Sequence, residues 1–312
     1  MENKYNCRIK VPAILGPTAS GKTSLALFIC NELKLEIISC DSRQIYKYLD
    51  IGTAKPTKEE QQKVKHWMID IITPDKKYSA YEYSIQALNI IKTKNVQNNR
   101  VLICGGTGLY FNSLSKGIGP QVPPDEQIRK NLKEIVEKYG KERIYNMLAE
   151  IDTETASKSH PSNLHRNIRA LEVYYKTGIP LSQQKRMASS PKEIDFFVIK
   201  LFPPRDILYD RINKRVDKMI RYGLFEEFLN IRKLGYNKDS PGLLSVGYKE
   251  LFNVENGKLS LKEATEKIKQ NTRNLAKRQI TWFKHQVKGI EINYIDNAEK
   301  KILDLLKEYL KI

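Results

Sequence analysis

The sequence predicts an α/β protein of the phosphate-loop NTPase type, in which helices flank a parallel sheet and an all-helical domain interrupts the chain. Two observations carry this prediction. β-Rich runs alternate with helical patterns in the first and last parts of the chain, which is typical of parallel strands joined by helical crossovers. Residues 125–187 between them show helical periodicity only. We therefore expect a core of residues 1–120 and 195–312, with a helical insertion of residues 121–194.

The first expected strand ends in a glycine-rich loop. An apolar run at residues 11–15 leads into Gly16-Pro17-Thr18-Ala19-Ser20-Gly21-Lys22-Thr23, and an apolar helix pattern follows at once. Strand, Gly-x-x-x-x-Gly-Lys-Thr and helix in this order are typical of a phosphate-binding loop, as in nucleotide and ATP sites. The loop amides and the helix N-terminus hold phosphate, Lys22 reaches the outer phosphate, and the Thr23 hydroxyl can ligate Mg²⁺. An ordinary strand-to-helix turn is the alternative.

Further strand-like runs follow in the order that a crossover fold requires. They lie at residues 35–40, 67–72, 100–104 and 195–202, with a last short run near 292–295 and a helical pattern at 81–92. The carboxyl ends of parallel strands line one crevice, so we expect Asp41, Thr73 and Thr107 to lie beside the phosphate loop. A Gly- and Pro-rich break at residues 117–124 opens the insertion, which has the position of a lid over that crevice.

Asp41 and Thr107 are the candidate catalytic residues. An Asp at the end of a strand serves as a metal ligand, as a general base, or simply as the N-cap of a following helix. Thr107 lies within Gly105-Gly106-Thr107-Gly108, which either makes a tight turn or lets a ligand approach the backbone closely. An ATPase would place an acidic residue here to help hold Mg²⁺, and this loop has none. The residues alone leave these alternatives open.

Composition restricts the partners of the protein. The 312 residues carry a net charge of +18, which attracts polyanions such as nucleic acid, although biased genome composition also enriches lysine. No apolar run approaches the ~20 residues needed to cross a bilayer, and the first residues lack the apolar segment of a secretion signal. We expect a cytoplasmic protein without membrane contact. Its four cysteines are too scattered for a zinc site or a disulfide framework, so buried reduced thiols are expected.

Basic residues cluster in two places. In the insertion, Arg166 and Arg169 lie three residues apart on one helix face beside His165, either as a solvated face or as a grip for phosphates. Near the C-terminus, Lys277-Arg278-Gln279-Ile280-Thr281-Trp282-Phe283-Lys284 combines bases with aromatics, as nucleic-acid surfaces do. Both aromatics are equally compatible with the core side of an amphipathic helix, and for Phe283 we expect that position.

Six motifs in sequence resemble those of the bacterial tRNA dimethylallyltransferases, also called tRNA isopentenyltransferases. The resemblance covers nearly the whole chain, so it is far more specific than the phosphate loop alone. The motifs are Gly-Pro-Thr-Ala-Ser-Gly-Lys-Thr at 16–23, Asp-Ser-Arg-Gln-Ile-Tyr at 41–46 with Leu-Asp-Ile-Gly-Thr-Ala-Lys-Pro after it, Gly-Gly-Thr-Gly-Leu-Tyr at 105–110, Arg-Ala-Leu-Glu-Val-Tyr at 169–174, Val-Gly-Tyr-Lys-Glu at 246–250 and Ala-Lys-Arg-Gln-Ile-Thr-Trp-Phe at 276–283.

This resemblance implies transfer of the dimethylallyl group of dimethylallyl diphosphate to the exocyclic N6 amine of the adenosine just 3′ of the anticodon in tRNA, releasing diphosphate. By family analogy, Asp41 acts as the general base and Thr107 lies beside the flipped adenosine. The phosphate loop and Arg215 would hold the diphosphate, with Mg²⁺ near Thr23 as cofactor. The missing acidic residue after the strand at 100–104 is then explained, because the loop would hold a leaving group and not hydrolyse ATP.

The resemblance also implies that the insertion and the basic C-terminal segments clasp the anticodon stem-loop from two sides. The residues that it assigns to tRNA are Asp41, Ser42, Arg43, Gln44, Thr107, Arg129, His165, Arg166, Asn167, Ile168, Arg169, Lys249, Lys277, Arg278, Gln279, Thr281, Trp282 and Lys284. His165 departs from the Gln or Arg expected at its position, which weakens that one assignment. We expect the enzyme to act as a monomer.

Three other functions fit parts of the sequence. A small-molecule or nucleotide kinase would share the loop, the sheet and the lid, but it leaves the basic C-terminal third unexplained. An adenylate isopentenyltransferase would use free AMP or ATP as acceptor, whereas the long basic insertion favours a macromolecule. A phosphate-loop RNA-binding module would bind tRNA and leave its adenosine unmodified.

Overall fold

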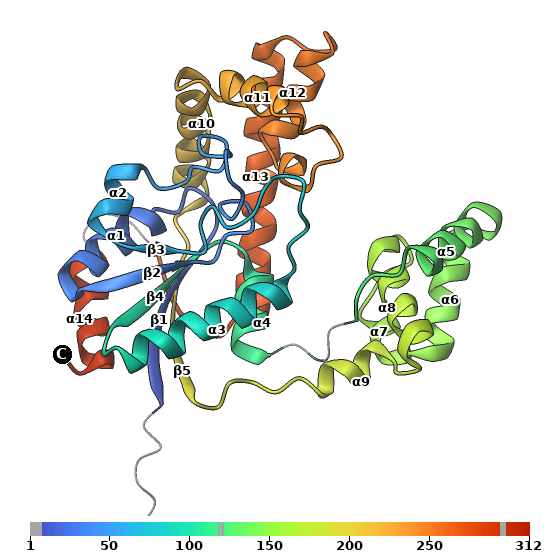
Figure 1. The fold of residues 1–312 in the computed structure, drawn as a ribbon, viewed down its shortest axis with the longest axis horizontal. Coiled ribbons are helices and arrows are strands. Elements are labelled where there is room, and N and C mark those ends of the chain that lie inside the picture. Colours follow the sequence, from blue (N-terminus) through green and yellow to red (C-terminus); the bar gives the residue numbers. More distant parts are fainter. Residues whose placement is uncertain (1–7, 118, 120–121, 294–297) are drawn as a thin grey trace, which may run out of the picture. The chain divides into compact units, whose positions relative to one another are not determined.

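The computed structural model describes residues 8–117, 119, 122–293 and 298–312 (Figure 1). The chain divides into two compact units, one of Met1–Ser115 with Lys192–Ile312 and one of Lys116–Pro191. The second unit thus begins and ends a few residues before the insertion expected from the sequence. None of the helices in the described part of the chain has the length and apolar character needed to cross a membrane.

A parallel sheet forms the centre of the first unit. Within the described residues it has six strands in the order β3-β2-β4-β1-β5-β6, and the recorded pairings are parallel. The strands are β1 (Ile9–Leu15), β2 (Leu35–Ser39), β3 (His66–Trp67), β4 (Arg100–Gly105), β5 (Ile194–Leu201) and β6 (Ile290–Ile292). β1 pairs with β4 on one side and β5 on the other, so the phosphate loop that follows it lies in the middle of the sheet edge. The predicted fold class is confirmed.

Helices cover both faces of this sheet, because the strands are apolar on both sides. On one face α1 (Lys22–Leu33) and α14 (Ala298–Leu310) pack on β1 and β2, and on the other α3 (Ala80–Val96) and α4 (Gly108–Lys116) do so. Phe283 is fully buried in the core between the sheet and the helices α3 and α4, as predicted. Cys30, Cys40 and Cys104 are buried free thiols, also as predicted, while Cys7 lies outside the described residues.

The apolar run at 67–72 is the one strand-like segment that the sequence overstated. Only His66–Trp67 pairs as β3, because Met68 and Asp70 have left-handed backbones, with φ of 64° and 57°, which end the strand. A single bridge joins Ile72 to Tyr46 beyond that point. β3 is an edge strand, separated from β1 by β2 and β4, and Thr73 is not among the residues that line the two central cavities.

A group of helices stands beyond the carboxyl edge of the sheet (Figure 1). Its members are α10 (Arg205–Arg221), α11 (Leu224–Lys233), the 3₁₀ turn Pro241–Leu244, α12 (Tyr248–Glu255) and α13 (Leu261–Gln286), while the short helix α2 (Lys58–Lys63), which precedes β3, has no buried residue. Phe228 and Tyr248 are fully buried in their shared core. Lys200 of β5, only 3% exposed, donates from Nζ to the carbonyls of Phe283 and Val287 and so fixes the C-terminal end of α13 to the sheet.

The second unit is all-helical in the residues that the structure describes. It contains α5 (Glu126–Tyr139), α6 (Lys141–Ile151), α7 (Thr153–Ser157), α8 (Leu164–Thr177) and α9 (Leu181–Arg186). α6 and α8 pack on each other and on α5 around an apolar core of its own, in which Ile144, Leu148 and Leu171 are buried. The last predicted strand is β6, which ends at Ile292; Tyr294 and Ile295 lie outside the described residues.

Gly105→Ala should destabilise the protein by about 3 kcal/mol, because a Cβ at this position would lie 2.1 Å from the carbonyl oxygen of Cys40, which is backbone and cannot move aside. Gly257→Ala is the matched control: its Cβ meets nothing within 4 Å, so only the left-handed backbone costs about 1 kcal/mol. Urea unfolding followed by circular dichroism measures both. Equal losses would mean that the close approach at Gly105 is not a constraint.

Candidate active site

Three loops at the carboxyl edge of the sheet are joined by backbone hydrogen bonds. The amide of Gly16 donates to the carbonyl of Gly105 (3.3 Å), Cys40 donates to Cys104 (2.7 Å), and Thr107 donates to Cys40 (3.0 Å). The sheet pairing therefore continues past the strand ends into the phosphate loop, the turn at Asp41 and the Gly105–Gly108 loop. These three loops form one rigid edge on which side chains can be placed accurately.

The phosphate loop has the geometry that its sequence predicts. It leaves β1 after Leu15 and enters α1 at Lys22, with left-handed backbones at Ala19 (φ 62°) and Gly21 (φ 89°) that turn the chain. Lys22 bends back so that its Nζ donates to the carbonyl of Pro17 at 3.0 Å. The ammonium group is thereby held over the loop, where an outer phosphate would bind.

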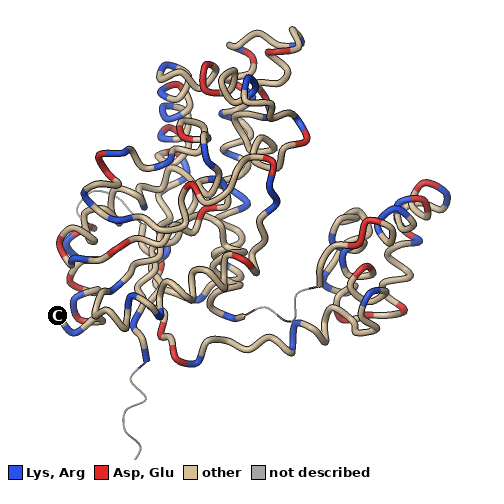
Figure 2. Tube along the Cα trace, in the orientation of Figure 1, with Lys and Arg blue, Asp and Glu red and all other residues tan. Residues whose placement is uncertain are grey.

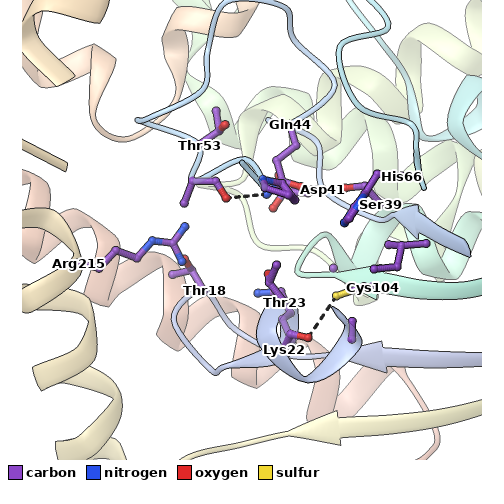
Figure 3. A pocket seen from close by; sticks show the side chains of 15 residues that line it. Thr18, Lys22, Thr23, Ser39, Asp41, Gln44, Thr53, His66, Cys104 and Arg215 are labelled. Carbon is purple, nitrogen blue, oxygen red and sulfur yellow. Dashed lines mark hydrogen bonds between the residues drawn. The ribbon is translucent and has the colours of Figure 1, made fainter. Parts of the chain in front are cut away.

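A first cavity lies directly beyond this loop (Figure 3). Lys22, Thr23, Asp41 and Arg215 all line it, from α1, from the turn after β2 and from α10, together with Thr18, and Figure 3 shows them around one space. Burial lowers the pKa of Lys22, and the nearby Arg215 adds to this effect; burial likewise lowers the pKa of Arg215 while Asp41 opposes it. Two partly desolvated cations beside a ring of amides make a site for a polyanionic group such as diphosphate.

A second, larger cavity of about 390 Å³ adjoins the first. Asp41, Thr18, Thr53 and Arg215 line both cavities, so Asp41 is one of the residues at which the two cavities meet. The second cavity has an apolar part and a polar part. The apolar part is lined by Val216, Met219, Leu244, Val246, Ile268 and Leu275, and the polar part by Ser42, Arg43, Thr107, Thr272, Arg278 and Gln279. Such a mixed wall suits an aromatic ring with polar edges.

Asp41 forms an Asx turn and does not cap a helix. Its Oδ1 accepts from the amide of Arg43 at 2.8 Å, and the residues after it form turns, so the helix N-cap interpretation is wrong. Thr107 holds this turn from the neighbouring loop: its Oγ1 accepts from the amide of Ser42 at 2.9 Å and donates to the Ser42 hydroxyl at 3.2 Å. Thr107 thus positions the turn that carries Asp41, and it also lines the second cavity.

Gln279 joins α13 to both glycine-rich loops. Its Oε1 accepts from the amide of Thr18 and its Nε2 donates to the carbonyl of Gly106, each at 2.9 Å. Trp282, one turn further along α13, packs so closely on Gly108 that a Cβ there would lie 2.1 Å from the ring. Both residues are predicted tRNA contacts, and the structure shows that their side chains already hold the two loops. Their hydrogen bonds and ring contacts could not be read from local sequence.

The other predicted tRNA residues of the first unit lie around these cavities, on α12 or on α13. Arg43 donates to the carbonyl of Pro241 (3.1 Å), and Gln44, in the first cavity, donates to that of Ala54 (3.1 Å). Lys277, Arg278, Thr281 and Trp282 line an exposed groove along α13. Lys249 and Lys284 lie on α12 and α13 and are exposed. Figure 2 shows further Lys and Arg residues recurring along α10.

In the second unit, Arg129 and Arg169 converge on one buried carboxylate. Glu172 is fully buried, and its two oxygens accept from Arg129 (2.8 and 3.1 Å), from Arg169 (2.6 Å) and from the amide of Asp125 (2.7 Å). Burial opposes the charge on Glu172, but the hydrogen bonds from Arg169, Asp125 and Arg129 outweigh it and lower the pKa. Both arginines therefore have a structural partner and are about one third exposed, at 27% and 32% of their side chains.

Two predicted tRNA contacts of this unit need correction, because their side chains are buried. Asn167 is inaccessible; it accepts from the Ser159 hydroxyl and donates to the carbonyl of His160, so it holds the segment before α8. Ile168 is 8% exposed and belongs to the apolar core. Helical spacing placed both beside His165 and Arg166, whose side chains do remain accessible, but spacing alone does not distinguish the buried face.

The first cavity also contains residues that the sequence motifs did not identify as site residues. Ser39, Thr53 and His66 line it, and burial lowers the pKa of His66. Thr53 belongs to the Leu-Asp-Ile-Gly-Thr-Ala-Lys-Pro segment. The glycine and proline of this segment indicate a loop, and that was the sequence signal available for Thr53. Among the described residues, no three His, Cys, Asp or Glu side chains gather as a metal site. Thr23, Ser39 and Asp41 instead offer hard oxygen atoms, which fit Mg²⁺ when phosphate oxygens complete its shell.

These features define a phosphate-loop protein whose anion pocket opens into a second cavity, with one carboxyl between the two. A family model described as IPP transferase matches residues 44–286. The chain is 46% identical over 280 residues to the tRNA dimethylallyltransferase of Thermoanaerobacter sp. strain X514, covering 88% of this chain and 89% of that one. The chain therefore belongs to the IPP transferase family.

Other relatives extend the match over nearly the whole length. The tRNA dimethylallyltransferase of Thermotoga maritima is 43% identical over 302 residues, covering 97% of this chain and 98% of its own. The crystal structure of the tRNA isopentenylpyrophosphate transferase from Bacillus halodurans superposes with a TM-score of 0.72 at 35% identity and covers 97% of both chains. The predicted family resemblance is thus confirmed.

The affinity of the protein for pyrophosphate should fall as the pH rises toward the ordinary lysine range. Because burial lowers the pKa of Lys22, its ammonium loses the proton at a lower pH than an exposed lysine would, and a neutral amine no longer attracts the anion. Calorimetric titration at a series of pH values measures this. Pyrophosphate itself gains charge over the same range, so Lys22→Arg, which stays protonated, is the reference. Parallel profiles for the two proteins would contradict the role of Lys22.

Proposed function

We propose that this protein transfers the dimethylallyl group from dimethylallyl diphosphate to the N6 amine of the adenosine 3′-adjacent to the anticodon of tRNA. The observation that carries the proposal is the position of Asp41, the one carboxylate residue that the described linings of the anion cavity and the second cavity share. One cavity would hold the donor and the other the acceptor base. The activity named for the relatives, tRNA dimethylallyl transfer, supports this reaction.

The donor binds through its diphosphate. The loop amides, Lys22 and Arg215 hold the phosphate oxygens, and the allyl group points toward the second cavity. As the bond between the allyl C1 and the diphosphate oxygen breaks, both of its electrons go to the diphosphate. The fixed cations and amides stabilise this growing charge, which is where electrostatic preorganisation contributes most. The absence of an acidic residue after β4, among the described residues, fits a leaving group better than an ATPase site.

The acceptor is activated by Asp41. The lone pair of an adenine amine is delocalised into the ring, so the amine is a weak nucleophile until a base takes its proton. As N6 bonds to the allyl C1, the carboxylate of Asp41 accepts the N6 proton, which balances the reaction. The adenosine must leave its stack to reach this position, and the second cavity, with Ser42 and Thr107 at its polar side, receives the flipped base.

Mg²⁺ is the proposed cofactor. Thr23 would hold it together with the diphosphate oxygens, and the metal would neutralise charge on the leaving group. In its absence Lys22 and Arg215 still bind the diphosphate, so the metal adds to a site that the chain's own cations already define.

Both units offer basic residues for the tRNA backbone. In the first unit these lie on α13, where Arg278 lines both the second cavity and the exposed groove with Trp282. In the second unit His165 and Arg166 are accessible, and Arg129 and Arg169 are partly so. The net charge of +18 favours this polyanionic partner over a small acceptor such as AMP. We also propose a cytoplasmic location, in keeping with a tRNA substrate.

The direct test is to incubate the protein with dimethylallyl diphosphate, Mg²⁺ and unmodified tRNA, and to digest the tRNA for mass spectrometry. A mass gain of one dimethylallyl group on the adenosine beside the anticodon is expected. AMP in place of tRNA should gain no prenyl group. Prenylation of free AMP would refute the proposal in favour of an adenylate isopentenyltransferase. Binding of tRNA without its modification would refute it in favour of an RNA-binding module.

Asp41→Asn should lower kcat by about 100-fold or more, the contribution of a positioned general base. The amide keeps the Oδ1 acceptor for Arg43, so the turn and the melting temperature should be preserved, and the dissociation constant for tRNA should stay within about twofold. Single-turnover prenylation and a filter-binding assay measure these quantities. Equal losses of catalysis and tRNA binding would instead make Asp41 a structural residue.

Arg278→Ala should raise the dissociation constant for tRNA and reduce the slope of its logarithm against the logarithm of salt concentration by about 1, because one phosphate contact is removed. Lys307→Ala is the control and should leave the slope unchanged. Lys307 is exposed on α14, which packs on the sheet face opposite to the one that α13 contacts through Phe283. If both variants changed the slope equally, the effect would come from net charge and not from the α13 surface.

A further inference from the structure

The wall between the two cavities is a loop without regular secondary structure, residues 50–56. Gly52 and Thr53 line the second cavity, and Thr53, Ala54 and Pro56 line the first. A loop in this position decides the width of both cavities. Its place must be fixed by contacts from outside, because it has no strand or helix partner to pair with.

One carboxylate outside the cavities captures the start of this loop. Glu227, in the first turn of α11, accepts at Oε2 from the amides of Asp50 (2.9 Å) and Ile51 (2.7 Å) and at Oε1 from that of Gly52 (3.1 Å). Three consecutive backbone amides on one carboxylate form a nest, the arrangement by which proteins bind anions. Here the anion is supplied by the chain itself, and hydrogen bonds to a charged acceptor are the stronger kind.

Tyr248 of α12 completes this arrangement. Its hydroxyl donates to Glu227 Oε1 at 2.6 Å, and its fully buried ring packs against Gly52 so closely that a Cβ there would lie 2.5 Å from it. The hydroxyl fixes the orientation of the carboxylate, and the ring supports the backbone that the carboxylate holds. Glu227 and Tyr248 therefore act on the same three residues of the loop.

The far end of the loop has separate anchors. Lys55, whose side chain is 2% exposed, donates to the carbonyl of Tyr46 and pairs with Asp50 and Asp70. Gln44 donates to the carbonyl of Ala54. Removal of Glu227 would thus loosen residues 50–52, which keep bonds within the loop from Lys55 to Asp50 and from the Ala54 amide to the Ile51 carbonyl. Because residues 54–55 remain attached, the predicted effect is a local displacement of the cavity wall and not unfolding.

We propose that Glu227 is a positioning residue for catalysis: through Asp50, Ile51 and Gly52 it sets the wall of the second cavity at Gly52 and the position of the next residue, Thr53, which lines both cavities. Glu227 lines neither cavity among the described residues, and it faces an outer groove with Tyr48 and Tyr222. It therefore acts on substrate only through the loop. This inference rests on the proposed function for its catalytic part and on the observed hydrogen bonds for its structural part.

The test compares Glu227→Gln with Glu226→Gln. Both remove one negative charge from the same turn of α11, but Glu226 is exposed and makes none of the recorded bonds to the loop. A glutamine at 227 can accept from two of the amides, while its NH₂ group faces the third donor, so that bond is lost. We expect the KM for dimethylallyl diphosphate to rise about tenfold in Glu227→Gln, the loss of about one charged hydrogen bond, while the tRNA dissociation constant and the melting temperature match those of Glu226→Gln.

Two measurements need no catalysis and keep the inference separate from the proposed reaction. Pyrophosphate binding by calorimetry should weaken in Glu227→Gln only, and hydrogen exchange should accelerate at the amides of residues 50–52 relative to the rest of the chain. If wild-type protein fails to prenylate tRNA, the reaction is wrong, and these two measurements still decide the role of Glu227.

Tyr248→Phe keeps the ring and removes one of the four bonds to Glu227, so it should shift pyrophosphate binding in the same direction by a smaller factor; it carries the test if Glu227→Gln does not fold. The inference is overturned if pyrophosphate affinity and exchange at residues 50–52 are the same in the Glu227 and Glu226 variants. It is equally overturned if donor binding, tRNA binding and melting temperature all fall together, since that is the signature of a general structural role.

Discussion

The site depends on two cations held partly out of water, Lys22 and Arg215, which face one cavity at the end of the sheet. Bringing them together is unfavourable without an anion, since burial works against both charges. Asp41 offsets part of this cost, and a diphosphate would offset the rest. The parallel sheet makes this possible, because it brings the end of β1 beside the ends of β2 and β4, and α10 carries Arg215 over the same edge.

The second requirement is that the cavity for the anion and the cavity for the acceptor share a fixed boundary. Three elements far apart in sequence supply it. Thr107 holds the turn of Asp41, Gln279 ties the phosphate loop to the Gly105–Gly108 loop, and Glu227 holds residues 50–52. Each acts through hydrogen bonds to backbone groups, which fixes loops that have no regular structure of their own. We propose that a phosphate loop in this setting holds a leaving group next to an acceptor, and not a nucleotide for hydrolysis.

Local patterns were sufficient to predict the sheet, the phosphate loop and the helical unit, because strand-loop-helix order and helical periodicity are properties of neighbouring residues. The apolar run at 67–72 misled, since left-handed backbones at Met68 and Asp70 leave no trace in hydrophobicity. The resemblance to a family supplied Arg215, which no spacing relates to the loop. Some features depend on tertiary contacts between distant segments, so they required the structure. These are the hydrogen bonds from Gln279 to two loops, the burial of Asn167 and the nest of amides around Glu227.

The central claim is that the phosphate loop holds a diphosphate leaving group for an alkyl transfer. The most direct measurement is the stoichiometry of products in one reaction containing tRNA, dimethylallyl diphosphate and ATP, with pyrophosphate, orthophosphate and prenylated adenosine quantified together. The structure predicts one pyrophosphate for each prenylated adenosine and no orthophosphate derived from ATP. Orthophosphate release that depends on Lys22, with no matching prenylation, would contradict the claim and identify the loop as a nucleotide-hydrolysing or kinase site.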